Sequence, residues 1–432
     1  MLADVLSPIV VKRAEKLIKE RIIDVVNCDF HWKRMINNWS AVCGCNVGVT
    51  ALYAVKDTQK LAEIIKMSLD CMDVFLSGIT EDGACLEGAG YWYYGFGHFA
   101  YFCDYIEKAT DGRINYFDNP KVKKLATFNV KCIFPGNRAV SFSDSGTRVT
   151  RSLDIASFVY SKYPDTLPLD STVTSGCVSK CGCFNYLSES RALLWPTDCE
   201  LKTIDFDYGT HIYENAEWYI STSQNKVSIG AKAGHNAESH NHNDVGSFLV
   251  YKNGQDILLD IGSGEYCKAY FSKDRYNFFC TSSKGHNVPI INGAYQLCGK
   301  DARAINTVIS ENGISSDIAG AYKQPTLKKL LRTIDFNRTN GEIYLCDSYE
   351  FSEIPTAVVE RFVTSVEPLV YSDCVQINNN GEQMSIFYDG NVVPKISTET
   401  ESFGSGRNRL SYVIDFEVKD LKQNFEIKFI IK

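Results

Sequence analysis

Apolar residues recur at helical spacing in four stretches of the first half of the chain. The stretches cover residues 10–23, 61–76, 91–106 and 120–126, and the last opens on Pro120. Proline favours the first turn of a helix, because its missing N–H has no intrahelical partner there. Repeated helices joined by short links are typical of stacked helical hairpins. We therefore expect residues 1–200 to form a helical domain.

The pattern changes to alternation of apolar and polar residues from about residue 205 onward. Strand-like runs alternate with Asn-Gly pairs, which are typical hairpin turns, at 253–254, 312–313, 340–341 and 380–381. Two further alternating runs, 410–416 and 425–430, close the chain. We predict an antiparallel β-sandwich over residues 201–432. No low-complexity linker separates the two regions, so a cleft between them is an expected place for a site.

Length and composition agree with two domains and exclude some functions. The chain has 432 residues, 44% of them hydrophobic, and a net charge of -7, which argues against a nucleic-acid surface. No run reaches the roughly 20 apolar residues that span a membrane. The first residues lack a basic stretch followed by an apolar one, so no signal peptide is visible. We expect a cytoplasmic protein, or a periplasmic or secreted one if the N-terminus is incomplete.

Sixteen cysteines are scattered along the chain, and only Cys177, Cys181 and Cys183 crowd together. A zinc knuckle normally shows paired Cys-x2-Cys arrangements, which these three do not form. Free, buried and reduced thiols in a cytoplasmic or anaerobic setting are the favoured interpretation.

Side chains that can bind metals or transfer protons are concentrated in residues 235–244. Four of the seven histidines lie between His235 and His286. Imidazoles, carboxylates and amides crowd together in His240-Asn241-His242-Asn243-Asp244, which indicates a metal site, an acid/base site, or both. Two apolar strands joined by the turn at 253–254 follow immediately. The polar cluster is therefore expected at the end of a sheet.

Three segments of this region, residues 238–246, 259–262 and 282–289, resemble the heparinase II/III family of polysaccharide lyases. Upstream, residues 37–39, 82–83 and 87–94 resemble the matching stretches of that family's helical domain. The resemblance covers roughly residues 30–430. It implies an α+β multidomain fold, in which an incomplete (α/α) toroid of helical hairpins precedes an antiparallel β-sandwich. The chain departs from the family in having only about 37 residues before its Asn motif, so its helical domain is expected to be short.

The resemblance implies cleavage of a uronic-acid polymer by β-elimination. This reaction needs a group that neutralises the uronate carboxylate, a base for the C5 proton and an acid for the leaving oxygen. The family pattern assigns the first role to Asn38, the proton transfers to Tyr91 or Tyr94, and a base or neutralising role to His240. Two structural alternatives stay open: Asn38 could cap a helix that opens at Trp39, and the tyrosines could form an aromatic core face. Family members often have His where this chain has Trp39.

The resemblance also implies a structural zinc ion bound by His242, Asp260 and His286. Three hydrogen-bonded histidines at a polar end of the sandwich are the alternative. No organic cofactor is expected. Further candidates for substrate binding are Asn37, Trp39, Glu87, Glu238 and Arg275. The guanidinium of Arg275 could bind a uronate carboxylate, or it could form a salt bridge with an acid of the chain.

Three other functions compete with a lyase. A non-catalytic carbohydrate-binding protein would explain the short helical domain. A metal-dependent hydrolase is suggested by His240-x-His242-x-Asp244, although Val245-Gly246 then departs from the usual motif. A glycosidase would need a carboxylate pair, and no spacing singles one out. The expected partner is an acidic polysaccharide or oligosaccharide, with no nucleic acid and no membrane, and a homodimer is left open.

Overall fold

The computed structural model describes residues 5–149, 151–164, 173–174, 194–195 and 209–432. The chain divides into two compact units. The helical unit comprises Met1–Cys85, Tyr91–Thr127 and Arg151–Thr203, and the β unit comprises Leu86–Gly90, Phe128–Thr150 and Ile204–Lys432. The division is thus more interleaved than a single boundary near residue 200, because two short segments of the first half belong to the β unit.

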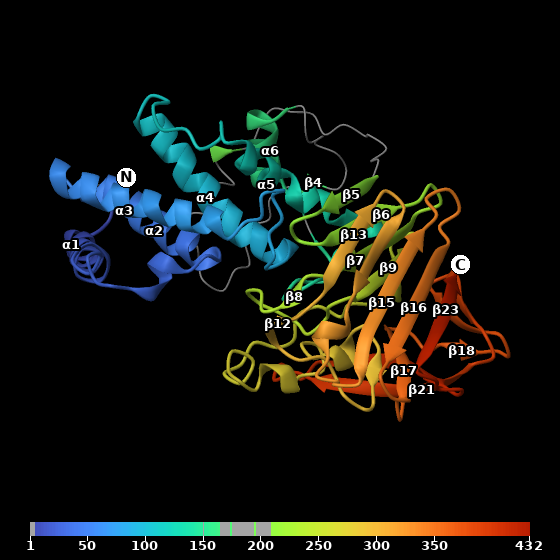
Figure 1. Ribbon diagram of the computed structural model, residues 1–432. Coiled ribbons are helices and arrows are strands. Elements are labelled where there is room, and N and C mark those ends of the chain that lie inside the picture. The colour runs from blue at the N-terminus through green and yellow to red at the C-terminus, as the bar shows by residue number, and fades with distance from the viewer. Residues whose placement is uncertain (1–4, 150, 165–172, 175–193, 196–208) are drawn as a thin grey trace. The chain divides into compact units, whose positions relative to one another are not determined.

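All four helices predicted from apolar spacing are present (Figure 1), and the described residues contain two further α-helices. The α-helices are α1 Pro8–Ile18, α2 Asn38–Ala54, α3 Thr58–Ser77, α4 Ala89–Ala109, α5 Pro120–Lys131 and α6 Leu153–Lys162. Shorter elements are the π-helix Lys19–Ile23, the 3₁₀ helix His31–Arg34, and the parallel pair β3 Arg151–Ser152 and β4 Val173–Thr174. The predicted helical region is confirmed, and its closure into part of a toroid stays a prediction.

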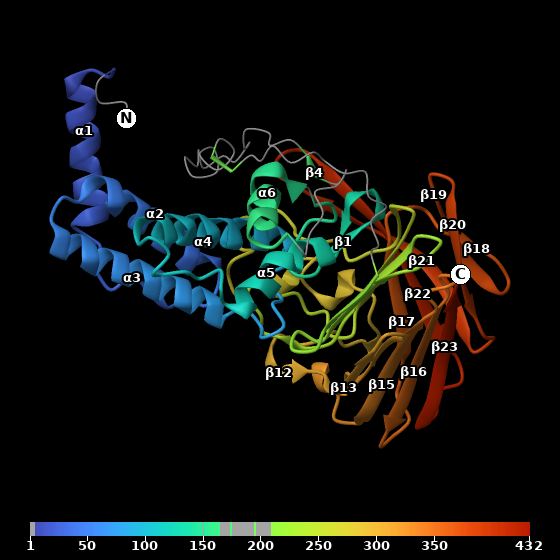
Figure 2. The ribbon, with the colours of Figure 1, turned by 90° about the horizontal axis from the view of Figure 1, so that it is seen from above.

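Small residues let α2 pack closely against its neighbours. Figures 1 and 2 show α2, α3 and α4 side by side. A Cβ atom on Gly44 would lie 2.6 Å from Cβ of Cys71 in α3, and one on Gly48 would collide with Phe102 of α4. This buried face carries small residues instead of large apolar ones, so apolar spacing did not predict α2.

The β unit contains three larger antiparallel sheets. The five-stranded sheet has the order β10 Gln255–Leu258, β9 Phe248–Lys252, β7 Val227–Lys232, β6 Trp218–Thr222 and β5 Thr210–Tyr213. The four-stranded sheet has the order β11 Ile290–Ile291, β17 Val358–Thr364, β22 Asn408–Val418 and β21 Val392–Ser402. The eight-stranded sheet has the order β13 Ile305–Ser310, β14 Gly313–Asp317, β15 Leu327–Phe336, β16 Ile343–Phe351, β23 Asn424–Ile431, β20 Glu382–Tyr388, β19 Cys374–Asn379 and β18 Leu369–Val370.

Shorter elements complete the β unit. They are the strand pairs β1 Ile133–Phe134 with β2 Arg138–Ala139 and β8 His235–Asn236 with β12 Gly299–Arg303, and the 3₁₀ helices Pro135–Asn137, Arg275–Asn277, Ser283–Gly285 and Ala319–Ala321.

One apolar core is shared by the three larger sheets. It includes Ile229 of β7, Leu345 of β16 and Phe362 of β17, all fully buried. Buried and exposed residues alternate along β16, as expected for a strand with one face on a core. The predicted antiparallel β region is therefore confirmed, and a core shared between sheets is what a β-sandwich requires.

Two of the four Asn-Gly pairs form the predicted two-residue hairpin turns. Asn253-Gly254 joins β9 to β10 and Asn380-Gly381 joins β19 to β20, with positive φ at all four residues. Both central residues of a type I′ turn need positive φ, which Asn and Gly adopt most easily. The pairs at 312–313 and 340–341 lie in the connections β13–β14 and β15–β16.

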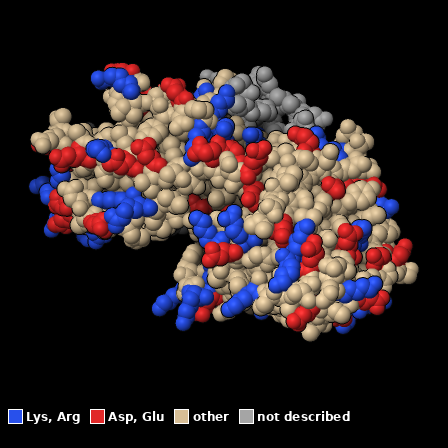
Figure 3. All heavy atoms as spheres, in the orientation of Figure 1, with Lys and Arg blue, Asp and Glu red and all other residues tan. Residues whose placement is uncertain are grey.

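Three general features concern membrane-spanning helices, surface charge and the cysteines. No helix in the described part of the chain is long and apolar enough to cross a membrane. Acidic and basic side chains are interspersed over the visible face (Figure 3). Every cysteine among the described residues is a free thiol. The prediction that these thiols are buried is wrong for Cys28, Cys267 and Cys298, which are exposed. Cys177, Cys181 and Cys183 lie outside the described residues.

Candidate active site and metal centre

A buried segment that follows β2 carries a carboxylate into the centre of the candidate site. The hydroxyl of Ser141 donates to the carbonyl of Asp260 at 2.7 Å, and the hydroxyl of Ser143 donates to the carbonyl of Leu86 at 2.9 Å. The segment is thereby held between the strand end after β10 and the turn that contains Glu87. Asp144 follows Ser143 directly, and its side chain is fully buried.

The carboxylate of Asp144 accepts hydrogen bonds from four side chains. Oδ2 lies 2.7 Å from Nδ1 of His240, and Oδ1 lies 3.1 Å from Nε2 of His242. The Tyr270 hydroxyl and the Arg275 guanidinium donate to Oδ1 at 2.5 and 2.8 Å. Burial alone would raise the pKa of Asp144, but the hydrogen bonds from both histidines and Arg275 lower it well below its usual value. Asp144 is therefore an ionised acceptor at the centre of the cluster.

His240 is held between two carboxylates. Its backbone adopts a left-handed conformation, with φ of 60°, which is uncommon for a residue with a side chain. While Nδ1 faces Asp144, Nε2 lies 3.5 Å from Oε2 of Glu87. The side chain keeps 13% of its surface exposed, and its ring edge faces Phe271. The local geometry thus presents Nε2 as the nitrogen that an incoming group can reach.

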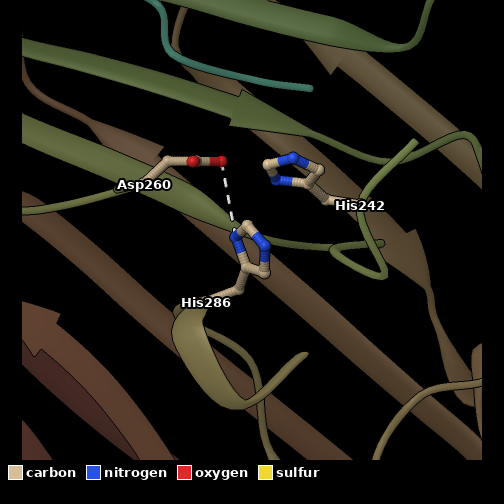
Figure 4. Close-up of side chains that lie close together, drawn as sticks. All are labelled: His242, Asp260 and His286. Atoms are coloured by element: carbon tan, nitrogen blue, oxygen red, sulfur yellow. Dashed lines mark ion pairs between the residues drawn. The ribbon is translucent and has the colours of Figure 1, made fainter. Parts of the chain in front are cut away.

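His242, Asp260 and His286 converge on one another (Figure 4). Nε2 of His242 faces Asp144, and Nε2 of His286 faces the carbonyl of Cys280 at 3.0 Å. Each histidine therefore turns its Nδ1 atom toward Asp260, whose Oδ2 lies 3.4 Å from Nδ1 of His286. One ligand atom from each of the three residues lies within 4.8 Å of the others.

The donor atoms of this cluster fit a metal ion such as zinc. Nδ1 of both histidines and Oδ2 of Asp260 are buried and have no hydrogen-bond partner, which is costly for polar atoms. Burial lowers the pKa of His242, whereas at His286 burial is outweighed by the charge of Asp260, which raises the pKa. Metal binding requires neutral imidazoles. Two nitrogen ligands and one carboxylate oxygen form a donor set that zinc accepts.

Lys232 contacts two acidic residues of the loop that carries His240 and His242. Its buried ammonium lies 2.8 Å from Oδ1 of Asp244 and 3.8 Å from Oε2 of Glu238. Burial raises the pKa of Glu238 to about 7. The predicted substrate-binding Glu238 is thus a buried neighbour of Lys232. Because Asp244 bonds Lys232, the triplet that suggested a hydrolase does not form a joint ligand set among the described residues.

Arg275 has its donors committed within the β unit. Its guanidinium donates to Asp144, to the carbonyl of Asn241 at 2.9 Å and to the carbonyl of Tyr270 at 3.3 Å. It also lies 4.5 Å from the centre of the Tyr270 ring. Of the two interpretations left open, the structure contains the salt bridge, and its partner is Asp144.

The Asn motif lies at the start of α2 in the helical unit. The side chain of Asn37 accepts a hydrogen bond from the backbone N–H of Trp39 at 3.1 Å, so Asn37 is the helix cap. The structural alternative that made Asn38 the cap is therefore wrong. Asn38 is the first helical residue and is buried, whereas Trp39 is 50% exposed.

Both candidate tyrosines lie on α4 and are half-buried. Nδ1 of His98 lies 2.8 Å from the carbonyl of Tyr94, whose ring meets the imidazole edge to face. Tyr93 bonds Ser152 at 2.9 Å, and Trp92 is buried and donates to the carbonyl of Leu125. Part of this aromatic stretch thus packs in the core, as the structural alternative proposed, and Tyr91 and Tyr94 stay candidates.

Sequence reasoning missed Asp144 and Tyr270. Asp144 stands alone in the run 139–146, where small and apolar residues surround it. The available signal was an isolated acid in a stretch with the composition of a buried segment. A buried carboxylate needs hydrogen-bond partners, so such an acid indicates a polar cluster. Nothing in that stretch indicated that the partners would be the histidines near residue 240.

Comparison with known proteins shows a family match in part of the β unit and a similarity of fold to solved structures. Residues 207–357 match the family model described as Heparinase II/III-like, C-terminal. A solved structure of heparinase III is 14% identical, with a TM-score of 0.69 over 98% of this chain and 63% of that one. The heparan sulfate lyase HepC from Pedobacter heparinus is 13% identical, with a TM-score of 0.64 over 91% of this chain and 59% of that one.

The comparison with curated proteins found no similar sequence. The chain spans roughly three fifths of the length of the solved structures that it resembles. At this level of identity the likeness to solved structures shows the fold.

Proposed function

Because residues 207–357 form a heparinase II/III-like C-terminal domain, we propose that the protein is a lyase of uronic-acid-containing polysaccharides or oligosaccharides. It would cleave them by β-elimination and leave an unsaturated uronate end. The observation that supports this most is the His240 site: an imidazole oriented by a buried carboxylate, in a chain that shares the fold of heparinase III over nearly its whole length.

The reaction assigns separate tasks to three side chains. The C5 proton of a uronate becomes acidic when the adjacent carboxylate is neutralised, so that the enolate-like charge is tolerated. We assign that neutralisation to the amide of Asn38. Tyr91 would remove the C5 proton and return it to the leaving glycosidic oxygen, with Tyr94 as the alternative. A single tyrosine can perform both transfers when they occur on the same side of the sugar.

His240 would act through Nε2, because Asp144 occupies Nδ1. As a base it would accept a proton at Nε2, and as a neutraliser it would donate a hydrogen bond from that atom to the uronate carboxylate. Glu87, 3.5 Å from Nε2, would then be displaced by the substrate or would orient a sugar hydroxyl. Trp39 exposes half of its surface and could stack on a sugar ring, and Asn37 would position it through the helix cap.

We further propose that His242, Asp260 and His286 hold a structural zinc ion. When bound, the ion would supply folding free energy and would fix the loop that carries His240. The residues that bind and transfer protons remain those named above.

A non-catalytic carbohydrate-binding protein is the second candidate. The observation in its favour is that part of the aromatic stretch that carries the candidate tyrosines packs in the helical core, where Trp92 is buried. Such a protein would bind acidic polysaccharides without cleaving them. A metal-dependent hydrolase is not supported, because Nδ1 of His240 bonds Asp144 and Asp244 bonds Lys232.

The test is the ultraviolet absorbance of the unsaturated uronate, followed across a panel of sulfated and unsulfated uronate polymers. We expect product from at least one polymer. Asn38→Ala should lower turnover by about 10²–10³-fold, the usual loss for a preorganised donor. The matched control is Asn46→Ala on the same helix, whose amide bonds only the carbonyl of Val42. If no polymer gives unsaturated product while some bind, the lyase proposal fails and the second candidate stands.

A further inference from the structure

Asp144 contacts both histidines of the site, one through each carboxylate oxygen. Building on the proposed function, we propose that Asp144 is a positioning residue that sets opposite tautomers on His240 and His242. It would thereby direct His240 toward the substrate and His242 toward the metal. Nothing in the local sequence links this carboxylate to the histidines, which lie nearly a hundred residues further along.

The first half of the inference concerns His240. An ionised carboxylate can only accept a hydrogen bond, so the nitrogen that faces it must carry the proton. Oδ2 of Asp144 lies 2.7 Å from Nδ1 of His240. Neutral His240 is therefore the Nδ1–H tautomer, and its lone pair is on Nε2, on the side of Glu87. A base or hydrogen-bonding group at that position needs this tautomer.

The second half concerns His242, which meets the same carboxylate through its other nitrogen. Oδ1 of Asp144 lies 3.1 Å from Nε2 of His242. Neutral His242 is therefore the Nε2–H tautomer, and the lone pair on Nδ1 faces Asp260 and His286. A metal ligand needs that lone pair, and the second hydrogen bond of such a ligand commonly fixes its tautomer in this way.

The carboxylate can serve both rings because it cannot turn. Arg275 and Tyr270 both donate to Oδ1, and Ser143 anchors the adjoining backbone. His240, with its left-handed φ, contacts Oδ2, and His242 contacts Oδ1 of the same carboxylate. An asparagine in place of Asp144 would offer a single acceptor oxygen and a donating NH₂ group, so it could not accept from both rings.

The wild-type protein provides the most direct test. Nitrogen NMR of protein labelled with ¹⁵N-histidine, recorded at alkaline pH, reports which ring nitrogen carries the proton. We expect Nδ1–H at His240 and Nε2–H at His242. The resonances are assigned with His240→Gln and His242→Gln. The same tautomer at both residues, or the reversed pair, overturns the inference.

Asp144→Asn gives a second, independent test. We expect turnover to fall by at least about 10²-fold, with KM nearly unchanged. Zinc affinity should fall about 10–100-fold. One of the two histidines should change tautomer. The matched control is Asp256→Asn. This variant also removes an Asp–Arg ion pair of the β unit, because Asp256 pairs with Arg138, but Asp256 contacts no histidine. Tyr270→Phe removes one donor to Asp144 and should leave both tautomers unchanged.

The failure of this inference can be told apart from the failure of the proposed function. If the wild type produces unsaturated uronate while Asp144→Asn keeps its turnover, zinc affinity and tautomers, Asp144 has no positioning role and the lyase stands. If the wild type has the expected tautomers but no polymer is cleaved, the positioning role stands and the catalytic function fails. Should Asp144→Asn not fold, the wild-type tautomers decide.

Discussion

Two buried polar clusters of the β unit differ in how completely their hydrogen-bonding atoms are partnered. We call the first the strand cluster, which consists of Arg332, Asp347, Tyr349 and Glu360. The second is the histidine cluster, which consists of His242, Asp260 and His286. All seven side chains are almost fully buried, so burial alone does not distinguish a scaffold from a site.

The strand cluster is closed. Arg332 donates through Nε and Nη2 to Asp347 at 2.9 and 2.6 Å, and through Nη2 to Glu360 at 3.2 Å. Its Nη1 atom donates to the carbonyls of Gly246 and Asn287 at 3.0 and 2.7 Å. No side-chain nitrogen or oxygen of this cluster is without a partner. A fully satisfied network of this kind stabilises one arrangement of the sheets.

The histidine cluster is open, because three of its atoms face one another with no hydrogen bond. Buried polar atoms that converge without hydrogen bonds could serve as ligands of an ion, whereas fully satisfied ones are typical of scaffold. The two clusters are also linked. Gly246 follows the loop that carries His242, and Asn287 adjoins His286, so Arg332 holds both segments in place.

The largest expected effects are on turnover and come from the proposed proton-transfer groups. Tyr91→Phe and His240→Ala should each lower turnover by about 10²–10⁴-fold without lowering the melting temperature, because neither belongs to the strand cluster. Product absorbance and thermal unfolding measure the two quantities. If Tyr91→Phe stays active and Tyr94→Phe does not, the tyrosine is misassigned but the mechanism holds.

The next effect is on stability and comes from the strand cluster. Arg332→Met leaves buried carboxyl groups without their cation, so the free energy of unfolding should fall by about 3–5 kcal/mol. Arg361→Met is the matched control, since Arg361 of β17 pairs with Asp415 of β22 within the four-stranded sheet. Both side chains are partly exposed, so the loss should be smaller. Denaturant titration measures both. Equal losses would mean that the closed cluster is no more important than an ordinary ion pair.

A smaller effect is expected from removing the metal. His286→Ala should abolish binding of about one equivalent of zinc, whereas His235→Ala, outside the cluster, should retain it. A ligand present at 100 times its Kd stabilises a protein by about 2.7 kcal/mol. A chelator should therefore lower the melting temperature of the wild type but not that of His286→Ala. Wild-type protein without metal, or with a melting temperature that a chelator leaves unchanged, would refute the zinc site.

Local sequence pattern predicted much of the fold but few of the hydrogen bonds at the candidate site. The alternation of 410–416 and the Asn-Gly pair at 253–254 act through neighbours in sequence, and β22 and the β9–β10 hairpin follow from them. Apolar spacing did not indicate helix α2, because its buried face consists of small residues such as Gly44 and Gly48, and only the capping alternative suggested a helix that opens at Trp39. Its position depends on partners in α3 and α4, which a local pattern does not contain.

The candidate site shows the same limit. The family resemblance named His242, Asp260 and His286, and the structure brings them together. It did not name Asp144, because the hydrogen bonds of that residue join segments nearly a hundred residues apart. The committed donors of Arg275 follow from the same long-range contacts. Contacts of this kind depend on topology, which composition and spacing do not encode.

The smallest expected effect is a pH dependence that arises from Glu238, on the loop between the two clusters. Burial raises the pKa of Glu238 to about 7 from a usual value of 4.5, although Lys232 opposes the shift. At pH values between 4.5 and about 7, Glu238 keeps a proton in the folded protein that it has lost in the unfolded chain. Glu238 therefore contributes more to the free energy of unfolding as the pH falls through that window. Above about pH 7 the folded protein bears the full cost of the buried charge.

Glu238→Gln removes this titration. The variant should be more stable than the wild type by on the order of 2 kcal/mol above pH 7, and the difference should shrink toward zero as the pH approaches 4.5. Denaturant unfolding at a series of pH values measures the difference, and Glu214→Gln, at an exposed position, is the control. A difference that does not change with pH would show that Glu238 stays ionised as the permanent partner of Lys232. The loop would then belong with the closed strand cluster, because its charges would be fully paired in the folded protein at every pH tested.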